Sequence, residues 1–145
     1  MTNLNIAPAP QATPGRRLVP ATIKFFDQIA RTVWIECPDW CTDDHVENAQ
    51  LAVEDIIHSS DTTDLGIGTL ENERLVFELH AQIRTEPDDR DPRLRQAHIV
   101  VDEGGEDALL TPDMADNLAD RMIAFAAQIR QLSRTARTHQ QGVTA

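Results

Sequence analysis

Both cysteines and two of the five histidines of this 145-residue chain fall within a segment of 22 residues. They are Cys37, Cys41, His45 and His58, which gives the spacing C-x3-C-x3-H-x12-H. Thiolate sulfur and imidazole nitrogen are the ligands that tetrahedral zinc takes in structural sites. We therefore predict a zinc ion held by these four residues. The 12-residue gap separates the two histidines, unlike in the usual zinc finger, so the prediction rests on ligand type more than on spacing.

Helix geometry limits how these four side chains can meet. On one unbroken helix, Cys37 and His45 would lie about 12 Å apart at about 1.5 Å per residue. Metal–ligand bonds of about 2.0–2.3 Å cannot span that separation. We therefore expect Cys37 at a strand end or in a tight turn beside Pro38. Cys41 and His45, four residues apart, are expected to share a single helical turn.

Carboxylates near the predicted ligands can orient the histidine rings. Asp55 precedes His58 by three residues, and we expect it to accept a hydrogen bond from that ring. Asp43 and Asp44 are alternatives for this role.

Three further histidines lie outside the segment. His80 and His98 fall on the polar faces of predicted strands, where we expect two exposed residues that lie near each other if the strands pair. Either could replace His58 as the fourth ligand. His139 lies close to the end of the chain and is not expected to take part.

Two other chemistries remain open for the segment. The cysteines could be small buried residues or a redox pair, although C-x3-C differs from the C-x-x-C motif. A metal-dependent hydrolase would need three protein ligands, a metal-bound water and a base such as Glu47 or Glu54. The chain has no H-E-x-x-H motif, nucleophile elbow or phosphate-binding glycine loop. We therefore expect a module without enzymatic activity.

Sequence patterns predict the elements that position the segment. Residues 1–20 contain four prolines and no periodic apolar pattern, so we expect a disordered tail. Residues 22–36 are rich in β-branched and aromatic residues, which predicts one or two strands, with a hairpin turn near Asp27-Gln28. Further strands are predicted at 65–70, 74–85 and 97–102, the second of them with clear apolar–polar alternation.

The C-terminal part of the chain predicts a long helix. Thr111 suits the N-cap, Pro112 the first helical position, and an apolar stripe runs on to residue 135: Leu118, Met122, Phe125, Ile129 and Leu132. The stripe has the 4-3 spacing of a coiled coil, but we expect it to pack on the sheet. The small residues Ala115, Ala119 and Ala126 would allow close approach of a partner helix, and hence a homodimer.

Together these patterns predict the α+β class. We expect a small, mostly antiparallel sheet packed against the long C-terminal helix, with an irregular segment stapled by zinc. The single domain is predicted at residues 21–136, between the tail at 1–20 and a frayed end at 137–145.

Charge restricts the partners. The chain has 13 Lys+Arg against 24 Asp+Glu, a formal net charge of −11 and a pI of about 4.7. Eleven of the acids lie between Glu36 and Glu73, where there is no Lys or Arg. This distribution suits a cation and a basic protein partner, and it disfavours contact with nucleic-acid phosphates. We expect no membrane span and no secretory signal, and hence a cytoplasmic protein, because no segment has the required apolar length.

Three motifs carry a resemblance to a known family. They are Cys37-Pro38-Asp39-Trp40-Cys41 followed by Asp44-His45, then Asp55-x-x-His58-Ser59, and finally Leu110-Thr111-Pro112. The chain resembles, over about residues 22–135, a family of small uncharacterised actinobacterial and actinophage proteins. The resemblance implies no activity. The sequence therefore predicts a zinc-binding interaction or regulatory module with an acidic surface for a protein partner.

Overall fold

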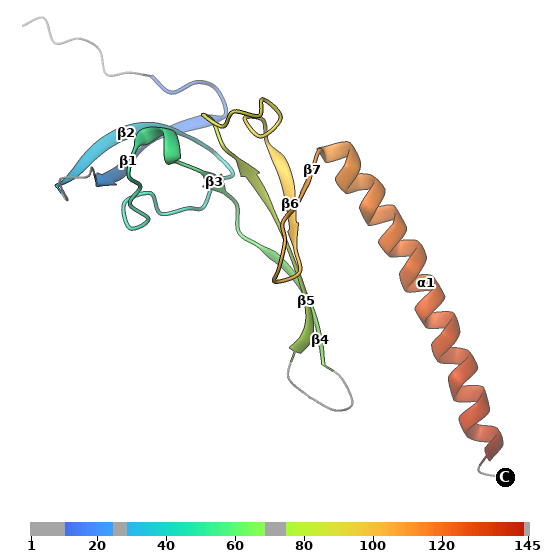
Figure 1. The fold of residues 1–145 in the computed structure, drawn as a ribbon. Helices are drawn as coiled ribbons and strands as arrows, with labels where there is room; N and C mark the ends of the chain where they lie inside the picture. The colour runs from blue at the N-terminus through green and yellow to red at the C-terminus, as the bar shows by residue number, and fades with distance from the viewer. Residues whose placement is uncertain (1–10, 25–28, 69–74, 144–145) are drawn as a thin grey trace, which may run out of the picture.

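The computed structural model describes residues 11–24, 29–68 and 75–143. In this part of the chain, two antiparallel sheets are followed by one long helix (Figure 1). The predicted α+β class, with antiparallel pairing and a long C-terminal helix, is confirmed. The strands are divided between two sheets, where the sequence analysis expected one.

The smaller sheet is a hairpin of β1 (Arg16–Lys24) and β2 (Ala30–Pro38). Its register runs from Arg16 opposite Pro38 to Lys24 opposite Ala30. The predicted hairpin is therefore present, although the turn expected near Asp27-Gln28 lies outside the described residues. Placing residues 16–20 in a tail was wrong. Pro20 is tolerated within β1 because each strand of a two-stranded sheet has an open edge that needs no donor.

The larger sheet has β5 (Leu75–Thr85) at its centre. One edge of β5 pairs with β3 (His58–Ser59) and with β4 (Thr63–Gly68). The other edge pairs with β6 (His98–Asp102), and β6 pairs in turn with β7 (Ala108–Leu110). All of these pairs are antiparallel. β4, β5 and β6 were predicted from the sequence. β3 and β7 were not, because their two and three residues are too short for a periodic signal.

The buried apolar core beside the hairpin is small. It contains three buried residues, with two half-buried residues of β2 packed against them: Ala21, Ile23 and Ile56, then Val33 and Ile35. Ile56 directly follows the single-turn 3₁₀ helix η1 (Val53–Asp55). Few side chains of the described residues are buried here, so this core gives limited hydrophobic stabilisation.

The helix α1 (Pro112–Val143) begins as predicted. Pro112 is its first residue, and the Met114 amide donates to the Thr111 hydroxyl at 3.3 Å. The helix continues past the expected end near residue 135, so residues 137–143 are helical and not frayed. No helix in the described ranges is long and apolar enough to cross a membrane.

The expected packing of the helix stripe on the sheet was wrong. α1 contacts β6 and β7 at its beginning, and the rest of the helix projects away from the sheets (Figure 1). Phe125 and Leu132 are 62% and 69% exposed. The helix is too long for the strands beside it to cover. A helix of 32 residues extends about 48 Å, whereas the three-residue and five-residue strands beside it extend about 10–17 Å.

Candidate metal centre

The fold brings together the four residues that the sequence predicted as ligands. Cys37, Cys41, His45 and His58 each offer one ligand atom, and these atoms all lie within 4.8 Å of one another. All four residues are buried, with exposed fractions between 0% and 7%. Both cysteines are free thiols. The cluster is therefore a buried two-cysteine, two-histidine site that could hold a metal ion.

Local structure explains how the first three residues reach one point. Cys37 lies at the end of β2, as expected, and the Cys41 amide donates to the Pro38 carbonyl at 3.1 Å across a tight turn. The expected helical turn shared by Cys41 and His45 was wrong. Asp44 Oδ1 accepts hydrogen bonds from the Val46 and Glu47 amides, so it caps a turn that begins at His45 and leaves Cys41 outside it.

The fourth residue comes from the larger sheet. His58 is the first residue of β3, which pairs with β5. The segment between Pro38 and His58 thus connects the two sheets, and the cluster joins their ends. The Thr42 amide donates to the Ser59 carbonyl at 2.9 Å across the same junction.

The distances within the cluster match a shared cation better than a hydrogen-bond network. The Nε2 atom of His45 lies 3.6 Å from Cys37 Sγ, 3.5 Å from Cys41 Sγ and 3.1 Å from His58 Nδ1. Tetrahedral zinc bonds imply separations of about 3.6 Å between sulfur and nitrogen and about 3.3 Å between two nitrogens. One ring nitrogen carries a single proton or a single lone pair, so it cannot form three hydrogen bonds at once.

Burial sets the protonation of these groups in the metal-free protein. Burial, and then the neighbouring His45, lowers the pKa of His58 to about 4, and burial also lowers the pKa of His45. Burial, and then the neighbouring Cys41, raises the pKa of Cys37 to about 12. The imidazoles are therefore neutral and available as ligands at pH 7. The Cys37 thiol would release its proton when a cation binds.

A carboxylate and a guanidinium support residues 37–58, which we call the ligand segment. Asp43 Oδ2 accepts a hydrogen bond from the Ser59 amide at 2.5 Å and lies 3.8 Å from Cys41 Sγ. Arg17 donates to the Cys41 carbonyl at 2.6 Å and to the Asp39 carbonyl at 3.3 Å. Arg17 was not predicted to support the site, because its position among residues 1–20 indicated a tail.

The role predicted for Asp55 was wrong. Its Oδ2 atom accepts a hydrogen bond from the Ala52 amide at 3.1 Å, so this carboxylate caps η1 and does not orient the ring of His58. The short helix places the carboxylate beside its own backbone, which competes for the acceptor.

The two histidines considered as replacements lie outside the cluster. The register of β5 and β6 places His98 opposite Arg84, so His80 and His98 do not pair. His80 meets Asp64 of β4, with 2.7 Å between Nδ1 and Oδ1. His98 is buried, contrary to the expected exposure, and its Nδ1 atom lies 3.0 Å from the Gln96 carbonyl.

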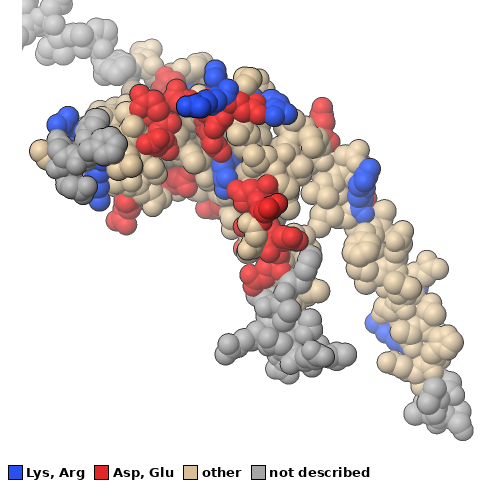
Figure 2. Space-filling view, viewed as in Figure 1, with Lys and Arg blue, Asp and Glu red and all other residues tan. Residues whose placement is uncertain are grey.

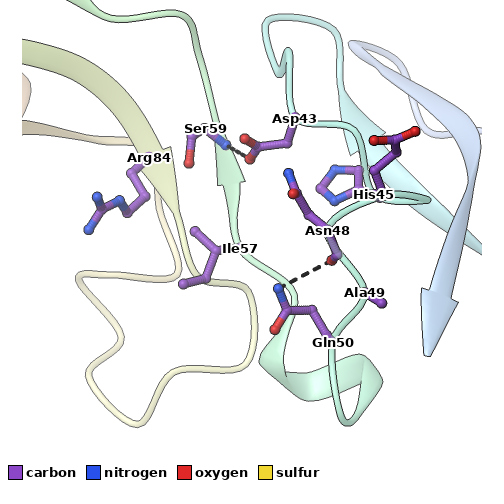
Figure 3. Close-up of a pocket in the computed structure, with 9 residues that line it drawn as sticks. Asp43, His45, Asn48, Ala49, Gln50, Ile57, Ser59 and Arg84 are labelled. Atoms are coloured by element: carbon purple, nitrogen blue, oxygen red, sulfur yellow. Dashed lines mark hydrogen bonds between the residues drawn. The ribbon is translucent and has the colours of Figure 1, made fainter. Parts of the chain in front are cut away.

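A cleft of about 520 Å³ lies beside the cluster (Figure 3). One wall is formed by the loop that follows Cys41, and His45 belongs to this wall. Ser59 and Arg84 approach from the larger sheet, and Ile57 from the residue just before β3. Arg84 pairs with Asp107 at 2.9 Å. The cleft therefore reaches one of the four grouped residues, while all four remain buried.

Two antiparallel sheets joined by a buried Cys/His cluster define the class: an α+β domain with a candidate metal site. The chain belongs to the family described as a domain of unknown function (DUF6907), which it matches over residues 21–138. This range contains the whole cluster and nearly coincides with the extent of the expected resemblance. No curated protein and no solved structure matches the chain. The predicted actinobacterial or actinophage origin stays a prediction.

Proposed function

We propose that this domain is a non-enzymatic interaction or regulatory module in which zinc staples the ligand segment between the two sheets. The observation that carries the proposal is the meeting of three donor atoms around His45 Nε2 at 3.1–3.6 Å. Four protein ligands complete the tetrahedral shell of zinc and leave no open position, as in structural zinc sites. Zinc is favoured because it prefers this mixture of thiolate and imidazole.

The proposed partner is a protein with a basic surface. The ligand segment carries exposed carboxylates and no Lys or Arg: Asp39, Asp44, Glu47, Glu54 and Asp55. Figure 2 shows acidic side chains gathered over the sheets and their loops, with basic side chains beside them along the upper edge. Such a surface attracts basic groups and speeds their encounter in a salt-dependent manner. The metal would hold this surface in one conformation.

Cobalt substitution tests the closed metal site. The full chain is loaded with Co²⁺, and its absorption spectrum is recorded before and after addition of azide. The proposal predicts one ion per chain and an intense tetrahedral spectrum that azide leaves unchanged. A spectrum that shifts with azide would reveal an exchangeable position and overturn the closed site.

Matched charge variants test the acidic surface. The probe is an oligo-arginine peptide, measured by calorimetry at low and high salt. The double variant Glu47→Gln/Glu54→Gln should weaken binding several-fold. The control variant Glu103→Gln/Glu106→Gln removes the same charge from an exposed loop outside the segment and should have a smaller effect. Equal effects of the two variants would contradict a specific acidic surface.

The alternative function is a metal-dependent hydrolase. The observation in its favour is the cleft beside the cluster, because His45 and Glu47 both line it. In this alternative a substrate in the cleft would reach the metal, and Glu47 would act as the base. Glu54, the other predicted base, lines a separate cavity with Glu86. The azide experiment separates the two functions, since only the hydrolase needs an exchangeable metal position.

A further inference from the structure

Most of the apolar stripe of α1 is uncovered in the described part of the protomer. We call Leu118, Met122, Phe125, Ile129 and Leu132 the seam. Four of its five residues are exposed, with exposed fractions from 38% for Met122 to 69% for Leu132. The spacing of four and three residues places them on one helix face, as in two-stranded coiled coils. A contiguous apolar stripe of this kind marks an interaction surface.

The charges of α1 are arranged symmetrically about Phe125. Three aspartates precede it by 12, 9 and 5 residues, and three arginines follow it by 5, 9 and 12 residues: Asp113, Asp116, Asp120, Arg130, Arg134 and Arg137. Leu118 and Leu132 likewise lie seven residues on either side of Phe125. With Arg121, the first half of the helix carries a net charge of −2 and the second half +3. The helix is therefore complementary to a reversed copy of itself.

We propose that α1 pairs with α1 of a second copy of this chain, antiparallel, with the two-fold axis near Phe125. A parallel pair would set the two acidic halves level with each other along the axis, and likewise the two basic halves. The antiparallel pair instead places the acidic half beside the basic half, and it also opposes the two helix dipoles. Helical spacing puts these charges on the face opposite the seam, so they act at longer range and are weakened by salt.

The projection of α1 makes this pairing possible. Beyond its contacts with β6 and β7, the helix extends away from the sheets and leaves its length open to a second helix (Figure 1). Its visible face in Figure 2 carries few charged side chains. The proposal rests on α1 alone and does not depend on the proposed metal or the acidic surface.

Sedimentation velocity on the full chain tests the pairing. We expect a concentration-dependent dimer that the variant Phe125→Glu weakens at least tenfold. The matched control is Ile123→Glu, because Ile123 is 70% exposed and lies outside the seam. The control should dimerise like the unaltered chain. Phe125 is itself exposed in the protomer, so both variants should fold, which circular dichroism verifies. A monomer at the highest soluble concentration, or equal weakening by both variants, would overturn the proposal.

Disulfide trapping tests the direction of the pair. Leu118→Cys and Leu132→Cys are prepared separately and oxidised alone or mixed. The antiparallel pair predicts a disulfide in the mixture and none in either variant alone, because equivalent residues would lie about 21 Å apart. The native cysteines are at most 1% exposed and should not interfere. Efficient cross-linking of each variant with itself would show a parallel pair and refute the antiparallel one.

Discussion

Removal of the metal should release the junction between the two sheets. Three of the proposed ligands, Cys37, Cys41 and His45, lie within nine consecutive residues. The fourth, His58, is the first residue of β3. The backbone bond from Thr42 to the Ser59 carbonyl spans the same junction. Because the metal would tie both sides together, opening of this junction should require its loss.

The size of the effect follows from binding linkage. Free zinc at 100 times its dissociation constant stabilises the bound form by about 2.7 kcal/mol. Each 1.4 kcal/mol corresponds to about a factor of ten. If the junction opens only after the metal leaves, exchange of the Thr42 amide should therefore be about 100-fold slower with zinc than with chelator. Amides in the middle of α1 should show little change, since this helix projects from the sheets.

Hydrogen–deuterium exchange measured by mass spectrometry provides the assay. Peptides that cover residues 37–60 are compared with peptides of α1, with zinc and with chelator. The variant His58→Gln should exchange like the chelated protein under both conditions. The control His80→Gln alters a histidine outside the cluster and should keep the zinc response. Equal exchange of residues 37–60 with and without zinc would refute the reasoning.

Three further predictions concern the site and the sheet. Chelation should lower the melting temperature by about 10 °C, because about 2.7 kcal/mol of stabilisation is lost. Calorimetry measures the melting temperature, and an unchanged value would contradict a structural metal. Arg17→Leu should destabilise the fold by about 1–3 kcal/mol, because it removes charged hydrogen bonds to the Cys41 and Asp39 carbonyls. Denaturant unfolding at fixed zinc measures this, and a free energy of unfolding equal to that of the unaltered chain would count against the role of Arg17. The bond to Asp64 raises the pKa of His80 above its ordinary value. The stabilisation from that pair should be complete below the unfolded-state pKa of His80 and lost as the pH rises through its folded-state pKa. Titration of His80 by NMR should show a lower pKa in the variant Asp64→Asn, and an unaltered pKa would refute the pairing.

Features encoded over short distances were predictable from the sequence. The alternation in β5 and the Thr111-Pro112 start of α1 are local patterns with a direct physical cause. The grouping of Cys37, Cys41, His45 and His58 was predictable because thiols and imidazoles this close in sequence are the ligand types that zinc takes.

Features that depend on distant contacts were not predictable. Arg17 supports the Cys41 carbonyl only because the hairpin brings it across from β2, and its proline-rich surroundings resemble a tail. His98 is buried beside residues distant in sequence, such as Leu109 and Thr111. The apolar stripe of α1 indicated a buried face, but it did not specify which surface would cover it.

X-ray absorption at the zinc edge shows whether the two cysteines and two histidines hold a zinc ion. The full chain is purified without chelator, and metal content is measured on the same sample. The account predicts one zinc per chain, with two sulfur ligands at about 2.3 Å and two nitrogen ligands at about 2.0–2.1 Å. A chain that binds no zinc, or zinc surrounded by oxygen and nitrogen without sulfur, would contradict the account.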